Sequence, residues 1–99
     1  MENERRTPKK RYRFTRQFEN SYAVLPDEIT NLFEKKLDIF LNNIFHPSLR
    51  TKKIKGLKRK IIWEASLTMD YRLTFEVDQN GDILFRNIGK HHIIDKGHF

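Results

Sequence analysis

Apolar side chains recur along the chain at two spacings, and each spacing predicts a different secondary structure. Between residues 26 and 46 they fall three or four apart, which places them on one face of a helix. These residues are Ile29, Leu32, Phe33, Leu37, Phe40, Leu41 and Ile44. Pro26 suits the first turn of this helix, and His46-Pro47 ends it. Phe18 and Tyr22, four apart, predict a shorter helix before it.

The second half of the chain alternates apolar and polar side chains, the period of a strand. Over residues 60–68 one face carries Ile61, Trp63, Ala65 and Leu67, and the other carries Ile62, Glu64, Ser66 and Thr68. Over residues 70–78, Tyr71, Leu73, Phe75 and Val77 lie opposite Arg72, Thr74 and Glu76. Asn80-Gly81 predicts a two-residue type I′ hairpin turn, because both of its central positions need a positive φ. Residues 82–88 form the next strand, which Gly89 closes.

Tyr12-Arg13-Phe14 predicts a short first strand, so the order of elements is β-α-α-β-β-β. This order predicts an α+β fold, with two N-terminal helices packed on one face of a small antiparallel sheet and the other face solvated. Residues 50–60 are a basic connector with room for a short extended piece. Residues 1–10 are polar and without a period, which predicts a flexible basic arm before a single domain at residues 11–99.

Composition narrows the class of protein. The chain of 99 residues has no cysteine, although a secreted domain of this size usually needs disulfides. No apolar run approaches the roughly 20 residues that span a bilayer, and the N-terminus does not look like a signal sequence. These features predict a cytoplasmic protein.

The positive charge is concentrated in two segments. The formal net charge is +7, with a pI of about 9.9. Residues 1–17 hold seven cations, and residues 50–60 hold seven more and no acid: Arg50, Lys52, Lys53, Lys55, Lys58, Arg59 and Lys60. Such clusters favour a polyanion, above all RNA, because binding releases counterions from phosphates. A solvated basic surface or an acidic protein partner explains the same charges.

Polar side chains converge on the open face of the predicted sheet, with Glu64, Ser66, Arg72 and Thr74 together. The last strand adds Arg86 if Leu84, Arg86 and Ile88 face outward, and Asn87 in the other register; Lys90 and His91 follow. Arginine stabilises a phosphorane, histidine transfers a proton, and glutamate activates a ribose 2′-OH. This set fits metal-independent RNA cleavage, and no cofactor is predicted. A zinc site is not expected, because the chain has no cysteine and no spacing that gathers three histidines.

The same residues have structural interpretations. A strand arginine opposite a strand glutamate is usually a cross-strand pair. Trp63 belongs to the apolar face, which favours a core position over base stacking. His46, before a proline, suits a residue that packs or caps at a helix end.

Four runs carry a resemblance to a known family: residues 45–56 (FHPSLRTKKIKG), residues 63–66 (WEAS), residues 71–75 (YRLTF) and residues 86–91 (RNIGKH). Their order and spacing resemble the RelE/ParE superfamily of bacterial toxin–antitoxin systems, and most of all its branch of cytotoxic translational repressors. The resemblance covers roughly residues 11–95.

The resemblance implies a microbial RNase fold and, for RelE-like members, metal-independent cleavage of mRNA in the ribosomal A site by 2′-OH attack. Arg72 matches the strand arginine that contacts the scissile phosphate, and His91 matches the position of a catalytic histidine or arginine. The basic segment from Lys52 to Lys60 is similar to the one that grips ribosomal RNA. A cognate antitoxin is the implied protein partner, and operator DNA is reached only through it.

Two departures from the family concern the general base. Glu64 and Ser66 stand where some ribonucleases of the family carry a Lys-x-Lys pair, so Glu64 is a base inferred from this chain alone. The C-terminal tyrosine of other members has no counterpart, and Phe99 is the nearest aromatic residue. Two alternatives stay open: a non-enzymatic ParE-like toxin acting on DNA gyrase, and an inactive homologue that binds an antitoxin.

Overall fold

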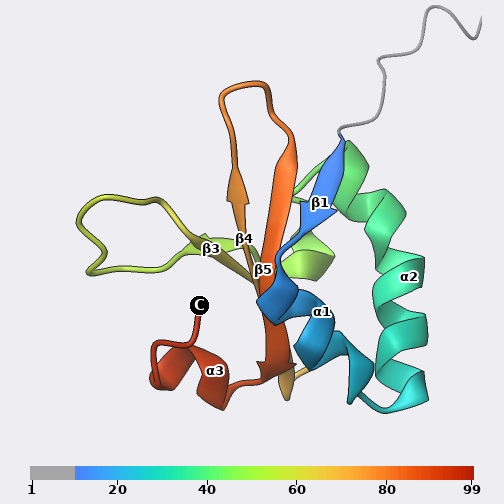
Figure 1. Ribbon diagram of the computed structural model, residues 1–99. Coiled ribbons are helices and arrows are strands. Elements are labelled where there is room, and N and C mark those ends of the chain that lie inside the picture. The colour runs from blue at the N-terminus through green and yellow to red at the C-terminus, as the bar shows by residue number, and fades with distance from the viewer. Residues whose placement is uncertain (1–10) are drawn as a thin grey trace, which may run out of the picture.

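The computed structural model describes residues 11–99 (Figure 1). The elements in chain order are β1 (Tyr12–Phe14), α1 (Arg16–Ala23), α2 (Asp27–Asn42), the 3-10 turn η2 (Pro47–Leu49), β2 (Lys52–Lys53), β3 (Trp63–Ser66), β4 (Tyr71–Val77), β5 (Ile83–Lys90) and α3 (His92–Asp95). The predicted arm at residues 1–10 lies outside the described residues.

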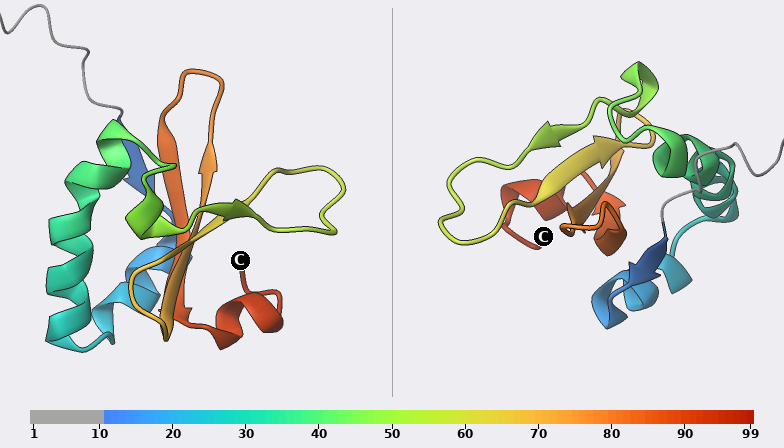
Figure 2. Two further views of the ribbon diagram at one scale, coloured as in Figure 1. Left: turned by 180° about the vertical axis from the view of Figure 1, so that it is seen from behind. Right: turned by 90° about the horizontal axis from the view of Figure 1, so that it is seen from above.

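One five-stranded sheet in the order β1-β5-β4-β3-β2 divides the molecule into layers. Helices α1 and α2 lie on one side, and α3 with the C-terminal residues lies on the other (Figures 1 and 2). The predicted α+β class is confirmed. The sheet is mixed, however, because β1 pairs with β5 in parallel, Tyr12 opposite Ile83 and Phe14 opposite Phe85. We call the side of α1 and α2 the helix side and the other side the open face.

An aromatic core joins the sheet to the helices. The Phe85 ring on β5 lies 5.4 Å from Phe33 and 5.6 Å from Phe40, centroid to centroid, and both of these rings come from α2. Phe18 on α1 lies 5.7 Å from Phe85. All four side chains are almost fully buried. The apolar face predicted for the long helix is therefore the face that packs on the sheet.

The ends of α2 differ from the prediction. Pro26 is the N-cap and lies outside the first turn, and the helix ends at Asn42, before Ile44 and His46. Asn43 is extended (φ −161°, ψ 99°), and its Oδ1 accepts a hydrogen bond from the Phe45 nitrogen at 3.0 Å. An asparagine side chain that bonds the backbone two residues on competes with helix continuation, which explains the early stop. Ile44 is still buried.

The β4–β5 hairpin uses a different turn from the one predicted. Among residues 11–99 the only non-glycine residue with a positive φ is Arg50, so Asn80 cannot form a type I′ turn with Gly81. The Asp78 carboxylate accepts hydrogen bonds from the nitrogens of Asn80 and Asp82, at 2.8 and 2.9 Å. Gly81, with φ +86°, supplies the single left-handed residue of this loop.

Strand β5 continues through Gly89 to Lys90, whereas the sequence predicted that Gly89 closes it. A Cβ at Gly89 would lie 3.0 Å from Cγ2 of Ile93 in α3. Glycine therefore allows α3 to pack directly against β5, a reason for glycine that is unrelated to strand termination.

Strand β3 begins at Trp63, and the inward position predicted for Ile61 is wrong. Ile61 is exposed, while Ile62 is buried. The Ile54 nitrogen bonds the Ile62 oxygen at 2.8 Å, so the ladder with β2 reaches Ile62 but not Ile61. Ile61 lies in the loop that projects from the sheet between β2 and β3 (Figure 1). In residues 11–99, none of the helices has the length and apolar character needed to cross a membrane.

Candidate functional site

Two arginines line one groove at the edge of the sheet, beyond the end of β2. The groove has a volume of about 250 Å³, and its lining includes three hydroxyl side chains. The lining residues are Ser48, Arg50, Ser66, Leu67, Thr68, Met69 and Arg72. Guanidinium groups beside hydroxyl donors are the side chains that recognise phosphate oxygens.

The guanidinium of Arg72 is fixed on one side and free on the other. Arg72 lies on the open face of β4, between Ser66 of β3 and Gly89 of β5. Its Nη1 donates to the main-chain oxygens of Thr68 at 2.8 Å and Met69 at 2.6 Å. Within residues 11–99, neither Nη2 nor Nε makes a hydrogen bond. This Nη2/Nε edge has the geometry for a bidentate contact to a phosphate.

The position of Arg50 follows from the 3-10 turn before it. The His46 ring caps this turn, since its Nδ1 accepts from the Ser48 nitrogen at 3.1 Å, as a capping histidine would. Leu49 is fully buried and anchors the turn in the core. Arg50 then takes a left-handed conformation with φ 50° and ψ 44°. This conformation is uncommon for a non-glycine residue, and here it brings Arg50 into the groove.

The turn between β3 and β4 links Arg72 to His91. Thr68 Oγ1 accepts from the nitrogens of Asp70 and Tyr71 at 3.1 and 3.0 Å, which holds this turn. The His91 nitrogen donates to the Asp70 oxygen at 2.8 Å. The main chain of His91 and the guanidinium of Arg72 are thus bonded to the same turn, at one end of the sheet.

The His91 side chain is oriented from α3. Its Nδ1 lies 3.3 Å from Oδ2 of Asp95, and both side chains are more than half exposed. Because Asp95 occupies Nδ1, the second ring nitrogen, Nε2, points away from Asp95. Nε2 makes no hydrogen bond within residues 11–99. His91 itself does not line the groove of Arg50 and Arg72.

Glu64 is buried, although it lies on the open face of the sheet. It pairs with Thr74, which pairs in turn with Asn87, so three polar residues form a row across β3, β4 and β5. All three are buried, and Thr74 Oγ1 has no hydrogen-bond partner within residues 11–99. The Nζ of Lys52 lies 3.9 Å from the Glu64 carboxylate. Glu64 therefore has a cationic partner but does not line the groove of Arg72.

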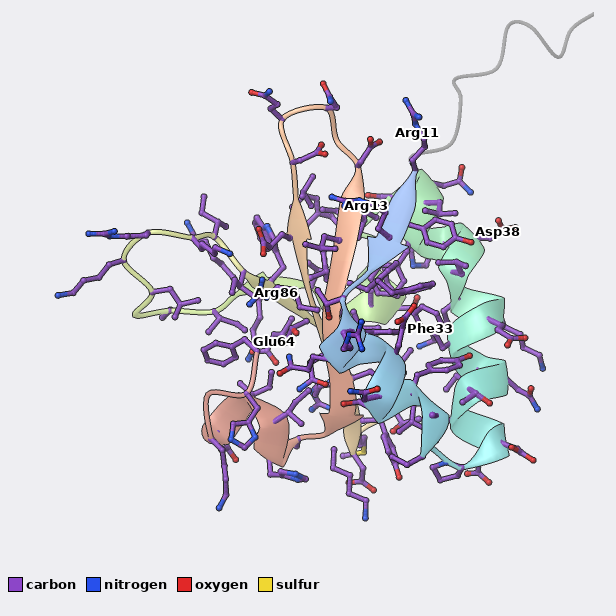
Figure 3. The ribbon with its side chains drawn as sticks, viewed as in Figure 1. Arg11, Arg13, Phe33, Asp38, Glu64 and Arg86 are labelled. Atoms are coloured by element: carbon purple, nitrogen blue, oxygen red, sulfur yellow. The ribbon has the colours of Figure 1, made fainter. Side chains whose placement is uncertain are left out.

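A β-bulge places both alternatives on the last strand, Arg86 and Asn87, on the open face. Phe75 pairs with Phe85 and Thr74 with Asn87, so Arg86 is the extra residue. Because the bulge shifts the alternation, Ile88 returns to the core and does not face outward. Figure 3 shows Arg86 and Glu64 on the side of the sheet away from α2 and Phe33.

Arg86 and Asn87 are bound to the C-terminal residues, so this part of the open face is not solvated as predicted. Arg86 Nη1 pairs with Glu76, which also lies 3.6 Å from Lys60 Nζ. Arg86 Nη2 donates to the Phe99 main-chain oxygen at 3.4 Å, and Asn87 Nδ2 donates to the His98 oxygen at 2.6 Å. Arg86 would have to leave these partners to reach RNA.

The remaining cations do not share one surface. Lys53 pairs with Trp63 and Lys90 pairs with Tyr71, and both aromatic residues pack on the helix side. Lys90 therefore does not converge with Arg72, as the sequence had predicted. Lys55 and Lys58 are exposed in the loop between β2 and β3. None of these four lysines makes an ion pair within residues 11–99.

Two features of the site were absent from the sequence interpretation. Ser48 was given no role, and its place in the groove depends on the 3-10 turn. The bulge had a visible signal, however. The buried positions of β5 change from the odd numbers of Ile83 and Phe85 to the even number of Ile88, with two polar residues between them.

A second, apolar groove of about 420 Å³ runs between β1, α1 and α2. Its lining is Tyr12, Phe14, Phe18, Glu19, Tyr22, Ala23, Phe33, Glu34 and Leu37. Tyr22 Oη donates to the Glu34 carboxylate at 3.3 Å. Burial, and after it the Glu34 charge, raises the pKa of Tyr22 above its usual value. The tyrosine is therefore a neutral hydrogen-bonding group at the rim of an apolar surface.

No protein-family model matches the sequence, and no curated protein matches it. Solved structures do match the fold. RelE in the archaeal RelE–RelB complex from Pyrococcus horikoshii has a TM-score of 0.69 at 19% identity, over 84% of this chain and 96% of that one. YoeB from Staphylococcus aureus has a TM-score of 0.70 at 15% identity, over 85% and 99%. YafQ in the E. coli DinJ–YafQ toxin–antitoxin complex has a TM-score of 0.69 at 12% identity, over 86% and 96%. The chain thus has the fold of the RelE, YoeB and YafQ toxins.

Proposed function

We propose that this chain, which shares its fold with the RelE, YoeB and YafQ toxins, is the toxin of a toxin–antitoxin pair and cleaves mRNA on the ribosome. The observation that carries the proposal is the groove lined by Arg50 and Arg72, where a fixed guanidinium has a free Nη2/Nε edge. A phosphate bound there gains charge as the 2′-oxygen attacks, so the contact strengthens in the transition state.

The proposed chemistry assigns phosphate binding and proton donation to residues at one end of the sheet. Arg72 binds the scissile phosphate, and Arg50 holds the same or the neighbouring phosphate. His91, oriented by Asp95, protonates the leaving 5′-oxygen through Nε2. Glu64 is the proposed base. It is buried, so it reaches a ribose only if Lys52 and the C-terminal residues on the open face move away. Lys52 is a further proposed RNA contact, Arg86 is one only after it leaves Glu76 and Phe99, and Lys90 would contact RNA from the helix side of the sheet.

The projecting loop is expected to bind RNA through charge alone. Replacing Lys55 and Lys58 with alanine should flatten the plot of log affinity against log salt by about 1.4, because each lost contact to a single strand contributes about 0.7. The measurement is filter binding of an RNA oligomer across a salt series. Arg16→Ala with Lys35→Ala removes the same charge from α1 and α2, and this control should leave the slope unchanged. An unchanged slope in the loop variant removes the loop from the interface.

The apolar groove between α1 and α2 is the proposed docking site for the antitoxin. Aromatic rings supply most of its surface, and the neutral Tyr22 hydroxyl and two glutamates lie among them, which suits an amphipathic helix. An antitoxin whose acidic part meets the basic segments and whose apolar helix fills this groove would neutralise the toxin without breaking its fold.

Filling the groove should prevent neutralisation. Ala23→Arg places a long side chain in the groove from an exposed helix position, and the complex with the antitoxin should weaken at least tenfold. Val24→Arg, the matched control, adds the same side chain one residue further on, at a position that is 81% exposed and outside the groove. The readouts are growth on co-expression and affinity by calorimetry. Equal rescue of both variants would contradict this docking site.

A further inference from the structure

Phe45 is a large aromatic side chain held in an exposed position. It is 58% exposed, although phenylalanine is usually buried. Its main chain is fixed by Asn43, whose Oδ1 accepts from the Phe45 nitrogen and whose oxygen accepts from the His46 nitrogen, both at 3.0 Å. Its ring lies 5.4 Å from the Trp63 ring in an edge-to-face arrangement with an angle of 79°. The exposure of this ring is therefore built into the local structure.

A cation without an ion pair among the described residues lies opposite one of the two rings, that of Trp63. Lys53 is directly opposite Trp63 in the β2–β3 ladder, so both side chains project to the same face of the sheet. Lys53 is exposed and makes no ion pair within residues 11–99. The neighbouring Lys52 projects to the other face, where it pairs with Glu64. The aromatic pair thus has its own cation, separate from the groove of Arg72.

The segment of sequence that contains Phe45 and Trp63 has no acidic residue. Residues 39–63 contain seven lysines and arginines and no aspartate or glutamate. A second copy of this chain, itself carrying +7, would be repelled from such a surface. Neither ring lines the apolar groove between α1 and α2 that suits a helix. An exposed aromatic ring with a neighbouring free lysine is the arrangement that stacks a base and neutralises its phosphate.

We propose that Phe45, Trp63 and Lys53 form a platform that stacks an unpaired RNA base, on the helix side of β2 and β3. The inference rests on the proposed function for the identity of the polyanion, but it does not require cleavage. The platform would bind RNA flanking the reacting phosphate or an unpaired ribosomal nucleotide. Stacking is worth about 1–3 kcal/mol per base, so loss of Phe45 should lower the affinity for RNA roughly 5- to 150-fold.

Trp63 reports on this platform directly, because it is the only tryptophan in the chain. The probe is an eight-nucleotide 2′-O-methyl uridine oligomer, which lacks the attacking hydroxyl and cannot be cleaved. It should quench Trp63 fluorescence, and an abasic oligomer of the same length and charge should bind more weakly and not quench. Phe45→Ala should remove most of the difference in affinity between the two oligomers without changing the salt slope. Val24→Ala, at another exposed apolar position, is the matched control and should change neither quantity.

The outcomes separate the platform from the cleavage site. Equal affinity of the wild-type chain for both oligomers, or equal quenching by both, overturns the platform. If Phe45→Ala weakens only the complex with the antitoxin, the patch binds protein and the proposal is wrong. Arg72→Ala should leave the quenching intact, so an inactive chain that still distinguishes the oligomers retains the platform even though the proposed cleavage has failed.

Discussion

Replacing Arg72 with alanine is expected to lower mRNA cleavage by roughly 10²–10⁴-fold, the usual scale for loss of one transition-state charge stabiliser. The variant removes the free Nη2/Nε edge from the groove, and Arg50 is then the one guanidinium left among the described lining residues. Arg72→Lys should recover little of this loss, since an ammonium keeps the charge but cannot make the bidentate contact. Primer extension on an mRNA under translation measures the cleavage.

Two controls separate a catalytic Arg72 from a structural one. Its Nη1 bonds the turn oxygens of Thr68 and Met69, so alanine should also destabilise the fold by about 1–3 kcal/mol, measured by thermal unfolding. Arg13→Ala removes an exposed arginine from β1, outside the groove, and should leave cleavage unchanged. Arg50→Ala should lose less than Arg72→Ala. If both arginines bind one phosphate, the combined variant should lose less than the product of the two effects. Wild-type cleavage by a folded Arg72→Ala would falsify the assignment.

The elements that periodicity predicted are those whose burial is one-sided and regular. Helix α2 buries Ile29, Phe33 and Phe40 on one face, and the spacing of apolar residues at three and four positions predicted this face. Strand β4 buries Leu73 and Phe75 against the helices. The parallel pairing of β1 with β5 has no such signal, because it joins residues about 70 positions apart over only three residues. Local sequence carries little information about such a contact.

The candidate site was predictable where it depends on strand alternation and unpredictable where it depends on irregular backbone. Alternation placed Arg72 on the open face. Arg50 lines the same groove as Arg72 because it takes a left-handed conformation after a 3-10 turn. The sequence at this point indicated only a basic connector, with no signal for the turn or for the left-handed residue. Arg86 and Asn87 are covered because the C-terminal residues fold back over the sheet and bond to them. Such contacts lie between side chains and main-chain oxygens, which no hydrophobic pattern records.

His91→Ala is the second variant with a large expected effect, a fall in cleavage of roughly 10²–10⁴-fold if His91 is the general acid. Its side chain is more than half exposed, and Asp95 is its one ion-pair partner among the described residues, so the fold should be little affected. Asp95→Asn tests the positioning of the ring. It should lower cleavage by at most about fivefold, because an ion pair this exposed contributes no more than about 1 kcal/mol.

The chemical role of His91 can be tested through the leaving group. A substrate whose scissile 5′-oxygen is replaced by sulfur leaves as a thiolate, which needs no protonation because thiols are far stronger acids than alcohols. His91→Ala should regain most of its lost rate on this substrate, measured as single-turnover cleavage relative to the wild type. Arg72→Ala should not, since the phosphate still gains charge in the transition state. Equal defects of His91→Ala on the oxygen and sulfur substrates would show that the imidazole acts by binding RNA rather than by donating a proton.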